Sequence, residues 1–107
     1  MKIVITTMKV GTWDRLKAFF SLTIYTDNMD TDGITIKGCK LVEGENGLFV
    51  SSPAEKKEVD GETKYFPLIW FGKNILKQIQ HLAIEEYEKK VAGESVENIT
   101  IEDLPNL

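Results

Sequence analysis

Apolar residues occupy every second position in one stretch of the chain, and this alternation constrains the fold more than any other feature of the sequence. They stand at Leu16, Ala18, Phe20, Leu22 and Ile24. Successive side chains of a β-strand point to opposite faces of a sheet, so a period of two residues predicts a strand with one buried face. Phe19 and Tyr25 lie on the second face among polar residues, which indicates that this face is also partly covered.

Further strand-like runs alternate with turn signals. Runs rich in β-branched and apolar residues predict strands over residues 2–10, over 34–42, from 48 and over 64–70. Between the first two strands, residues 11–14 have the composition of a turn. Residues 27–33 form a polar connection.

Two dipeptides are typical of hairpin turns because their residues tolerate positive φ: Asn46-Gly47 and Asp60-Gly61. The charged run over residues 56–63 therefore predicts an exposed hairpin arm with Asp60-Gly61 at its tip. Proline has no amide donor, so Pro53 is expected to end or bulge its strand, and Pro67 to lie at an edge or a break.

One helix is predicted from about Lys73 to Ala92. Its apolar residues form a stripe with helical spacing that is expected to pack on the sheet: Ile75, Leu76, Ile79, Leu82, Ala83 and Tyr87. Asn74 or Gly72 is placed to cap its start, and Gly93 to end it. Ile84 lies off the stripe, either as a lone exposed residue or as part of a subunit contact.

The chain divides into a domain over residues 1–93 and an acidic tail over 94–107. The four acidic residues of the tail account for the whole net charge of −4, so the domain itself is neutral. Such tails are usually solvated. Ile99 to Ile101 could add an edge strand, and the tail could also occupy a basic patch of the domain.

Composition excludes several classes of protein. No apolar run approaches the roughly 20 residues of a membrane span, and the first residues lack the features of a signal peptide. The single cysteine, Cys39, cannot form an internal disulfide. We therefore expect a cytoplasmic protein that does not bind membranes. One Cys and one His also leave too few ligands for a protein-only zinc site.

Residues that could support catalysis are scarce. The sequence has no nucleophile elbow, Walker loop or dinucleotide-binding glycine pattern. His81 lies on the polar side of the predicted helix, and Cys39 lies among apolar strand residues as a buried thiol. The acidic run over 27–33 lacks the glutamate and flanking helices of a calcium loop. We expect a binding protein without enzymatic activity, cofactor, metal or small-molecule substrate.

The predicted hairpin over residues 44–53, with the sequence GENGLFVSSP, resembles the G-x-N-G-L-F-V-x-x-P signature of the SpoVG family of septation and sporulation regulators. The features that follow the family's order are Lys56-Lys57, Asp60-Gly61-Glu62, Pro67 and Glu86-Tyr87. Residues 15–18 and 21–23 are similar to the family's second strand. The resemblance covers roughly residues 8–90.

The resemblance implies an α+β fold, in which an antiparallel sheet of about five strands carries one long C-terminal helix packed on it. It also implies a homodimer formed through β-strands. Members of the family bind DNA, and in some cases RNA, and affect gene expression and cell division. The same function is therefore expected of this chain.

On this hypothesis, seven basic residues are candidates for phosphate contacts: Arg15, Lys17, Lys56, Lys57, Lys64, Lys73 and Lys77. Lys73 and Lys77 are four residues apart and share one helical face. Lys73 also lies near the helix N-terminus, where free amides favour a phosphate. The alternative is a protein–protein interaction module on the same dimeric scaffold, which the neutral domain, the acidic tail and Ile84 favour.

Overall fold

The computed structural model describes the backbone of residues 1–103 and the side chains of residues 1–93. Within this part, the chain forms six strands followed by a helix. The strands are β1 (Lys2–Trp13), β2 (Leu16–Tyr25), β3 (Gly33–Gly44), β4 (Gly47–Ser51), β5 (Ala54–Val59) and β6 (Glu62–Pro67), and the helix is α1 (Lys73–Asp103). No helix in the described range combines the length and hydropathy needed to cross a bilayer.

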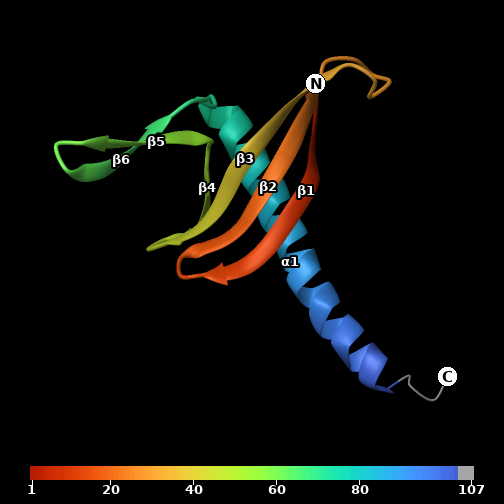
Figure 1. The fold of residues 1–107 in the computed structure, drawn as a ribbon. Helices are drawn as coiled ribbons and strands as arrows, with labels where there is room; N and C mark the ends of the chain where they lie inside the picture. The colour runs from red at the N-terminus through yellow and green to blue at the C-terminus, as the bar shows by residue number, and fades with distance from the viewer. Residues whose placement is uncertain (104–107) are drawn as a thin grey trace.

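The strands form two antiparallel units (Figure 1). Strands β1 to β4 make one sheet in sequence order, and β5 pairs only with β6 in a separate two-stranded ribbon. The α+β class and the long C-terminal helix are confirmed, with four strands in the main sheet where about five were predicted. Ser52 and Pro53 separate β4 from β5, and the Leu68 amide donates to the Pro53 carbonyl at 2.9 Å to close the base of the ribbon.

Strand β2 matches the prediction at both ends. The strand predicted over residues 64–70 lies instead at Glu62–Pro67, because its pairing with β5 ends where Pro67 is opposite Ala54. The turn predicted over residues 11–14 is wrong in position, because β1 continues to Trp13, which pairs with Leu16. The chain reverses at Asp14, whose φ is 59°. Asp is among the few non-glycine residues that tolerate this left-handed conformation.

The two predicted hairpins form, with different turn geometries. At the ribbon tip, Val59 pairs with Glu62, and both Asp60 and Gly61 have positive φ, at 53° and 79°. Between β3 and β4, Gly44 pairs with Gly47, and only Gly47 has positive φ, at 112°. The expectation of positive φ at Asn46 is therefore wrong.

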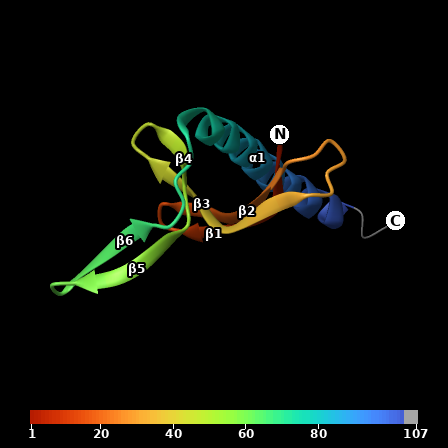
Figure 2. The same ribbon diagram turned by 90° about the horizontal axis from the view of Figure 1, so that it is seen from above.

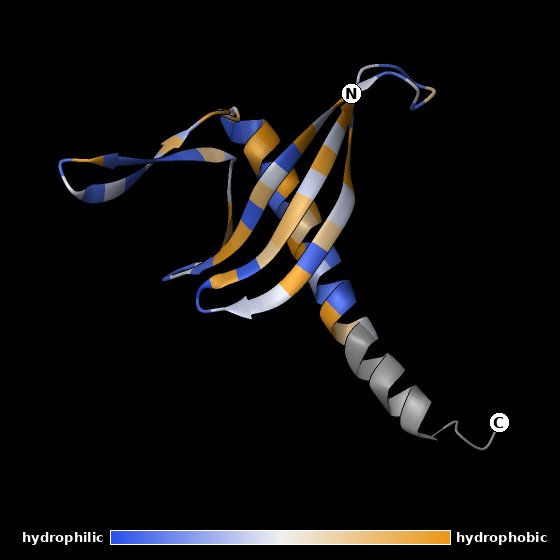
Figure 3. Ribbon diagram, in the orientation of Figure 1, coloured by the Kyte–Doolittle hydropathy of each residue, from blue (hydrophilic) through white to orange (hydrophobic). Residues whose placement is uncertain are grey.

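The core lies between one face of the four-stranded sheet and α1. Leu22 and Leu41 of the sheet and Ile79 and Ala83 of the helix are all fully buried. Complete burial of one such leucine contributes about 1.5–3 kcal/mol, so these contacts fix α1 on the sheet. Figure 3 shows bands of differing hydropathy alternating along the strands, as the two-residue period requires.

The helix begins as predicted and ends later. The Gly72 carbonyl accepts the Leu76 amide at 2.8 Å, which makes Gly72 the N-cap. The predicted end at Gly93 and the predicted edge strand over 99–101 are wrong, because α1 continues to Asp103. A glycine inside a helix costs only about 1 kcal/mol relative to alanine, so it need not end the helix. Ile84 is partly buried against the core, which corrects its expected exposure.

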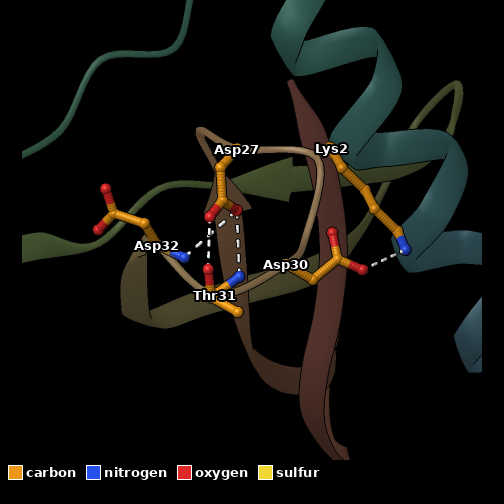
Figure 4. Close-up of polar contacts among 5 residues, drawn as sticks. All are labelled: Lys2, Asp27, Asp30, Thr31 and Asp32. Atoms are coloured by element: carbon orange, nitrogen blue, oxygen red, sulfur yellow. Dashed lines mark hydrogen bonds and ion pairs between the residues drawn. The ribbon is translucent and has the colours of Figure 1, made fainter.

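The acidic connection between β2 and β3 is folded by its own side chains (Figure 4). Asp27 accepts hydrogen bonds from the amide and hydroxyl of Thr31, the amide one at 3.0 Å. The Thr31 hydroxyl is the main cause that lowers the pKa of Asp27, followed by the Thr31 amide. Lys2 Nζ lies 2.7 Å from a carboxylate oxygen of Asp30 and ties the loop to β1.

Candidate nucleic-acid interface

The four-stranded sheet has a second face, which points away from α1. Leu41 and Val50 point into the core, so the alternating neighbours Lys40, Phe49 and Ser51 point to the opposite side. Figure 2 shows α1 on one side of the sheet and the ribbon of β5 and β6 projecting away on the other. We call the face opposite α1 the outer face.

A hollow of about 650 Å³ opens on the outer face, where the sheet meets the base of the ribbon. Its lining combines aromatic rings with cations and includes Trp13, Arg15, Lys40, Phe49, Ser51 and Tyr65. These residues come from β1, the β1–β2 turn, β3, β4 and β6. The hollow is therefore built by segments that lie far apart in the sequence.

The aromatic rings of the hollow are accessible to solvent. Trp13 is 42% exposed, Phe49 42% and Tyr65 57%. Lys40 Nζ lies 5.5 Å from the centroid of the Tyr65 ring, within the range of a cation–π contact. That contact links the main sheet to the ribbon.

Trp13 is held on the sheet by its neighbours. Its ring meets the ring of Phe19 edge to face, with centroids 5.3 Å apart and an interplanar angle of 63°. The ring also lies over Gly11 so closely that a Cβ at that position would overlap it. The absence of a side chain at Gly11 therefore makes room for Trp13.

Arg15 is placed at the rim of the hollow by the β1–β2 turn. Its carbonyl accepts the Glu43 amide at 2.8 Å, which pins this turn to β3. The Arg15 residue itself is exposed. The backbone is therefore anchored while the guanidinium remains available for a ligand.

Two of the seven predicted cations are engaged by acidic neighbours. Lys17 Nζ lies 3.2 Å from Glu43 and donates to the Asp14 carbonyl at 3.2 Å. Lys57 Nζ lies 3.7 Å from Glu55. The remaining five form no ion pair with any residue whose side chain is described: Arg15, Lys56, Lys64, Lys73 and Lys77.

The predicted cations of the ribbon lie on both of its faces. Lys57 and Lys64 are directly opposite each other in the β5–β6 register. Lys56 is opposite Tyr65, and so lies on the other face of the ribbon, toward the hollow. The face of Lys57 also carries Phe66, whose ring centroid is 5.9 Å from Lys57 Nζ.

The structure does not bring all seven cations to one surface of the chain. Lys73 and Lys77 are exposed on α1, while Arg15 lies on the outer face with the hollow. Lys77 borders a shallow depression with Gln78 and His81, and His81 Nε2 lies 3.5 Å from Glu85. The set therefore divides into a helix group and an outer-face group, with the sheet between them.

Of the six lining residues named above, the sequence-based candidates included only Arg15, and the other five were missed: Trp13, Lys40, Phe49, Ser51 and Tyr65. Lys40 lies between Cys39 and Leu41, both fully buried, so the two-residue period already placed it on the outer face. For Trp13 and Tyr65 there was no comparable signal, because their proximity depends on how the ribbon meets the sheet. The predicted buried position of Cys39 is correct, and burial raises the pKa of its thiol to about 11.

Comparison with known proteins identifies the family. A protein of Bdellovibrio bacteriovorus, whose name assigns it to septation and to SpoVG, is 32% identical over 96 residues, covering 86% of this chain and 80% of its own. The chain belongs to the SpoVG family. A Clostridium perfringens protein of the same name is 31% identical over 83 residues, covering 76% of this chain and 81% of its own. No protein-family model matches the sequence.

Proposed function

We propose that this SpoVG-family chain is a cytoplasmic, homodimeric regulator of septation and gene expression that binds DNA, or RNA, without catalysing a reaction. The septation role is supported by the names of the two relatives, which cover most of the chain. The observation that carries nucleic-acid binding is the group of five cations that form no ion pair with described side chains.

The charge argument concerns local groups, because the net charge of the chain is −4. Arg15, Lys56 and Lys64 lie on or near the ribbon and the outer face, and Lys73 and Lys77 lie one helical turn apart. Each cation that neutralises a phosphate releases a counterion from the nucleic acid, which makes binding favourable and dependent on salt. A dimer doubles the number of these groups on one particle.

The dimer is supported by an apolar segment at the end of the ribbon and in the connection to α1, which we call the apolar connection (residues 66–70). Phe66 is 43% exposed, Leu68 64% and Trp70 86%. Large apolar side chains clustered in this way mark a surface for association. A second copy that covers this segment would remove the three side chains from water.

Charge-reversing variants test the nucleic-acid contact. We expect Lys73→Glu combined with Lys77→Glu to weaken binding of a labelled DNA duplex by at least about tenfold. The matched control is Lys9→Glu combined with Lys37→Glu, which changes the net charge equally at two exposed lysines that are outside the seven candidates and form no ion pair with a described side chain. Equal binding by the two double variants would contradict a role for the helix group.

The apolar connection also favours a second candidate function, a protein–protein interaction module on the same scaffold. Leu68→Ser combined with Trp70→Ser distinguishes the cases by light scattering. If the connection holds the dimer together, the variant should have a mass of 12.1 kDa and the wild-type chain twice that mass. A wild-type dimer that binds no nucleic acid would favour the interaction module, and a wild-type chain of 12.1 kDa would contradict both candidates.

A further inference from the structure

We propose that the hollow on the outer face binds single-stranded nucleic acid, with bases stacked on Trp13 and Tyr65 and the backbone held by Arg15 and Lys40. This inference rests on the proposed function and extends it, because it names the form of nucleic acid and a binding site distinct from the helix group.

The chemistry of the lining supports this ligand. Exposed aromatic rings interleaved with cations are the combination that binds single strands, since every base has a face that stacks and every linkage has a charge. Trp13, Phe49 and Tyr65 supply three exposed rings within one hollow, and Arg15 and Lys40 supply the cations. In a duplex, the bases are already stacked on each other and could not reach these rings.

The part of the hollow that the main sheet builds is also organised before binding. The Trp13 ring packs against the Phe19 ring and against Gly11. The turn that carries Arg15 is held to β3 by the hydrogen bond from the Glu43 amide to the Arg15 carbonyl. Rings and backbone that are held in place lose less conformational entropy when a ligand binds. The hollow measures about 650 Å³, within the usual range of about 300–1,000 Å³ for ligand pockets.

Among the residues whose side chains are described, Asp14 is the one acidic residue in the lining, and it lies beside Arg15 in the β1–β2 turn. A carboxylate repels phosphate but accepts hydrogen bonds from the exocyclic amino group of a base such as cytosine. Its position is therefore compatible with a base inside the hollow and with phosphates at the cationic rim.

Trp13 fluorescence tests the inference directly. In a Trp70→Phe background, Trp13 is the only tryptophan. Phenylalanine keeps an aromatic side chain in the apolar connection, and light scattering checks that the background has the mass of the wild-type chain. A single-stranded oligodeoxynucleotide of about 16 nucleotides should quench it, and a duplex of the same sequence should quench it much less. Tyr65→Leu should weaken binding of the single strand about tenfold, whereas Tyr65→Phe, which keeps the ring, should retain it.

The possible failures are distinguishable. A chain that binds nucleic acid with unquenched Trp13, or equally well after Tyr65→Leu, overturns the stacking site and leaves the proposed function intact. A Tyr65→Leu variant that becomes monomeric in light scattering makes the hollow a subunit contact and overturns the inference. A chain that binds no nucleic acid in any form overturns the proposed function as well.

Discussion

The Lys40 ammonium lies 5.5 Å from the centre of the Tyr65 ring, and this contact joins β3 of the main sheet to β6 of the ribbon. The ribbon has no strand pairing with the sheet, so it depends on few contacts for its orientation. A cation–π contact at an exposed site contributes about 0.5–1 kcal/mol. That is enough to bias the angle of the ribbon without fixing it.

Replacing the cation should therefore loosen the ribbon locally. For Lys40→Met, we expect faster hydrogen exchange at the amides of β5 and β6, with a global stability loss below about 1 kcal/mol. Hydrogen exchange resolved by residue measures both effects, with Lys37→Met as the control on the same strand. Unchanged exchange in the ribbon would show that the contact does not orient it.

The space above Gly11 should be necessary for the position of Trp13. Gly11→Ala places a methyl group where the ring now lies, so the ring must move into solvent. In the Trp70→Phe background, we expect a red-shifted Trp13 emission and a stability loss of about 1–3 kcal/mol. Thr12→Ala, which changes an exposed neighbour, is the control. If Gly11→Ala and Thr12→Ala have the same Trp13 emission spectrum, the overlap between the Gly11 Cβ and the ring is contradicted.

The thiol of Cys39 should react slowly and affect stability only at high pH. Its pKa is raised by burial from 9.0 to about 11. The unfolded chain loses this proton first, so the stabilisation is complete below pH 9.0 and is lost as the pH rises toward about 11. A difference of two pKa units between the folded and unfolded chain corresponds to about 3 kcal/mol in the free energy of unfolding.

Denaturant unfolding at pH 8 and at pH 10.5 tests this prediction on the wild-type chain and Cys39→Ala. The variant should lose less stability between the two pH values, because it lacks the thiol while sharing all other titrating groups. Equal losses, or rapid modification of the native thiol by a disulfide reagent, would contradict the buried position.

The loop of Asp27 should weaken in acid. Hydrogen bonds from Thr31 lower the pKa of the Asp27 carboxyl below its ordinary value of 3.8. Its stabilising contribution is therefore complete above pH 3.8 and is lost as the pH falls through the lower folded value. An NMR titration of the Thr31 amide should give a midpoint below 3.8, and Asp27→Asn should abolish the titration. Asp60→Asn, at the ribbon tip, should leave it unchanged.

How far the sequence predicts this molecule depends on the range of the interactions involved. The ends of β2 and the Asp60-Gly61 turn follow from residues adjacent in the chain, and both were predicted. The direction in which the chain leaves the sheet after Ser51 was not predicted. Pro53 interrupts strand pairing, but it does not determine where the next strand lies. The hollow needed contacts between β3 and β6, which no local pattern encodes. The end of α1 was predicted at Gly93, but a single glycine is not sufficient to end a helix, and α1 continues past it to Asp103.

The central claim is that the five cations without an ion pair to a described side chain contact nucleic-acid phosphates, and binding as a function of salt tests it most directly. Fluorescence polarisation of a labelled oligonucleotide should be measured with the wild-type chain between about 50 and 200 mM salt. The logarithm of the association constant should fall linearly with that of the salt concentration, by about 0.7–0.9 per phosphate contacted. An affinity that does not change with salt, or no binding at the lowest salt, would contradict the claim.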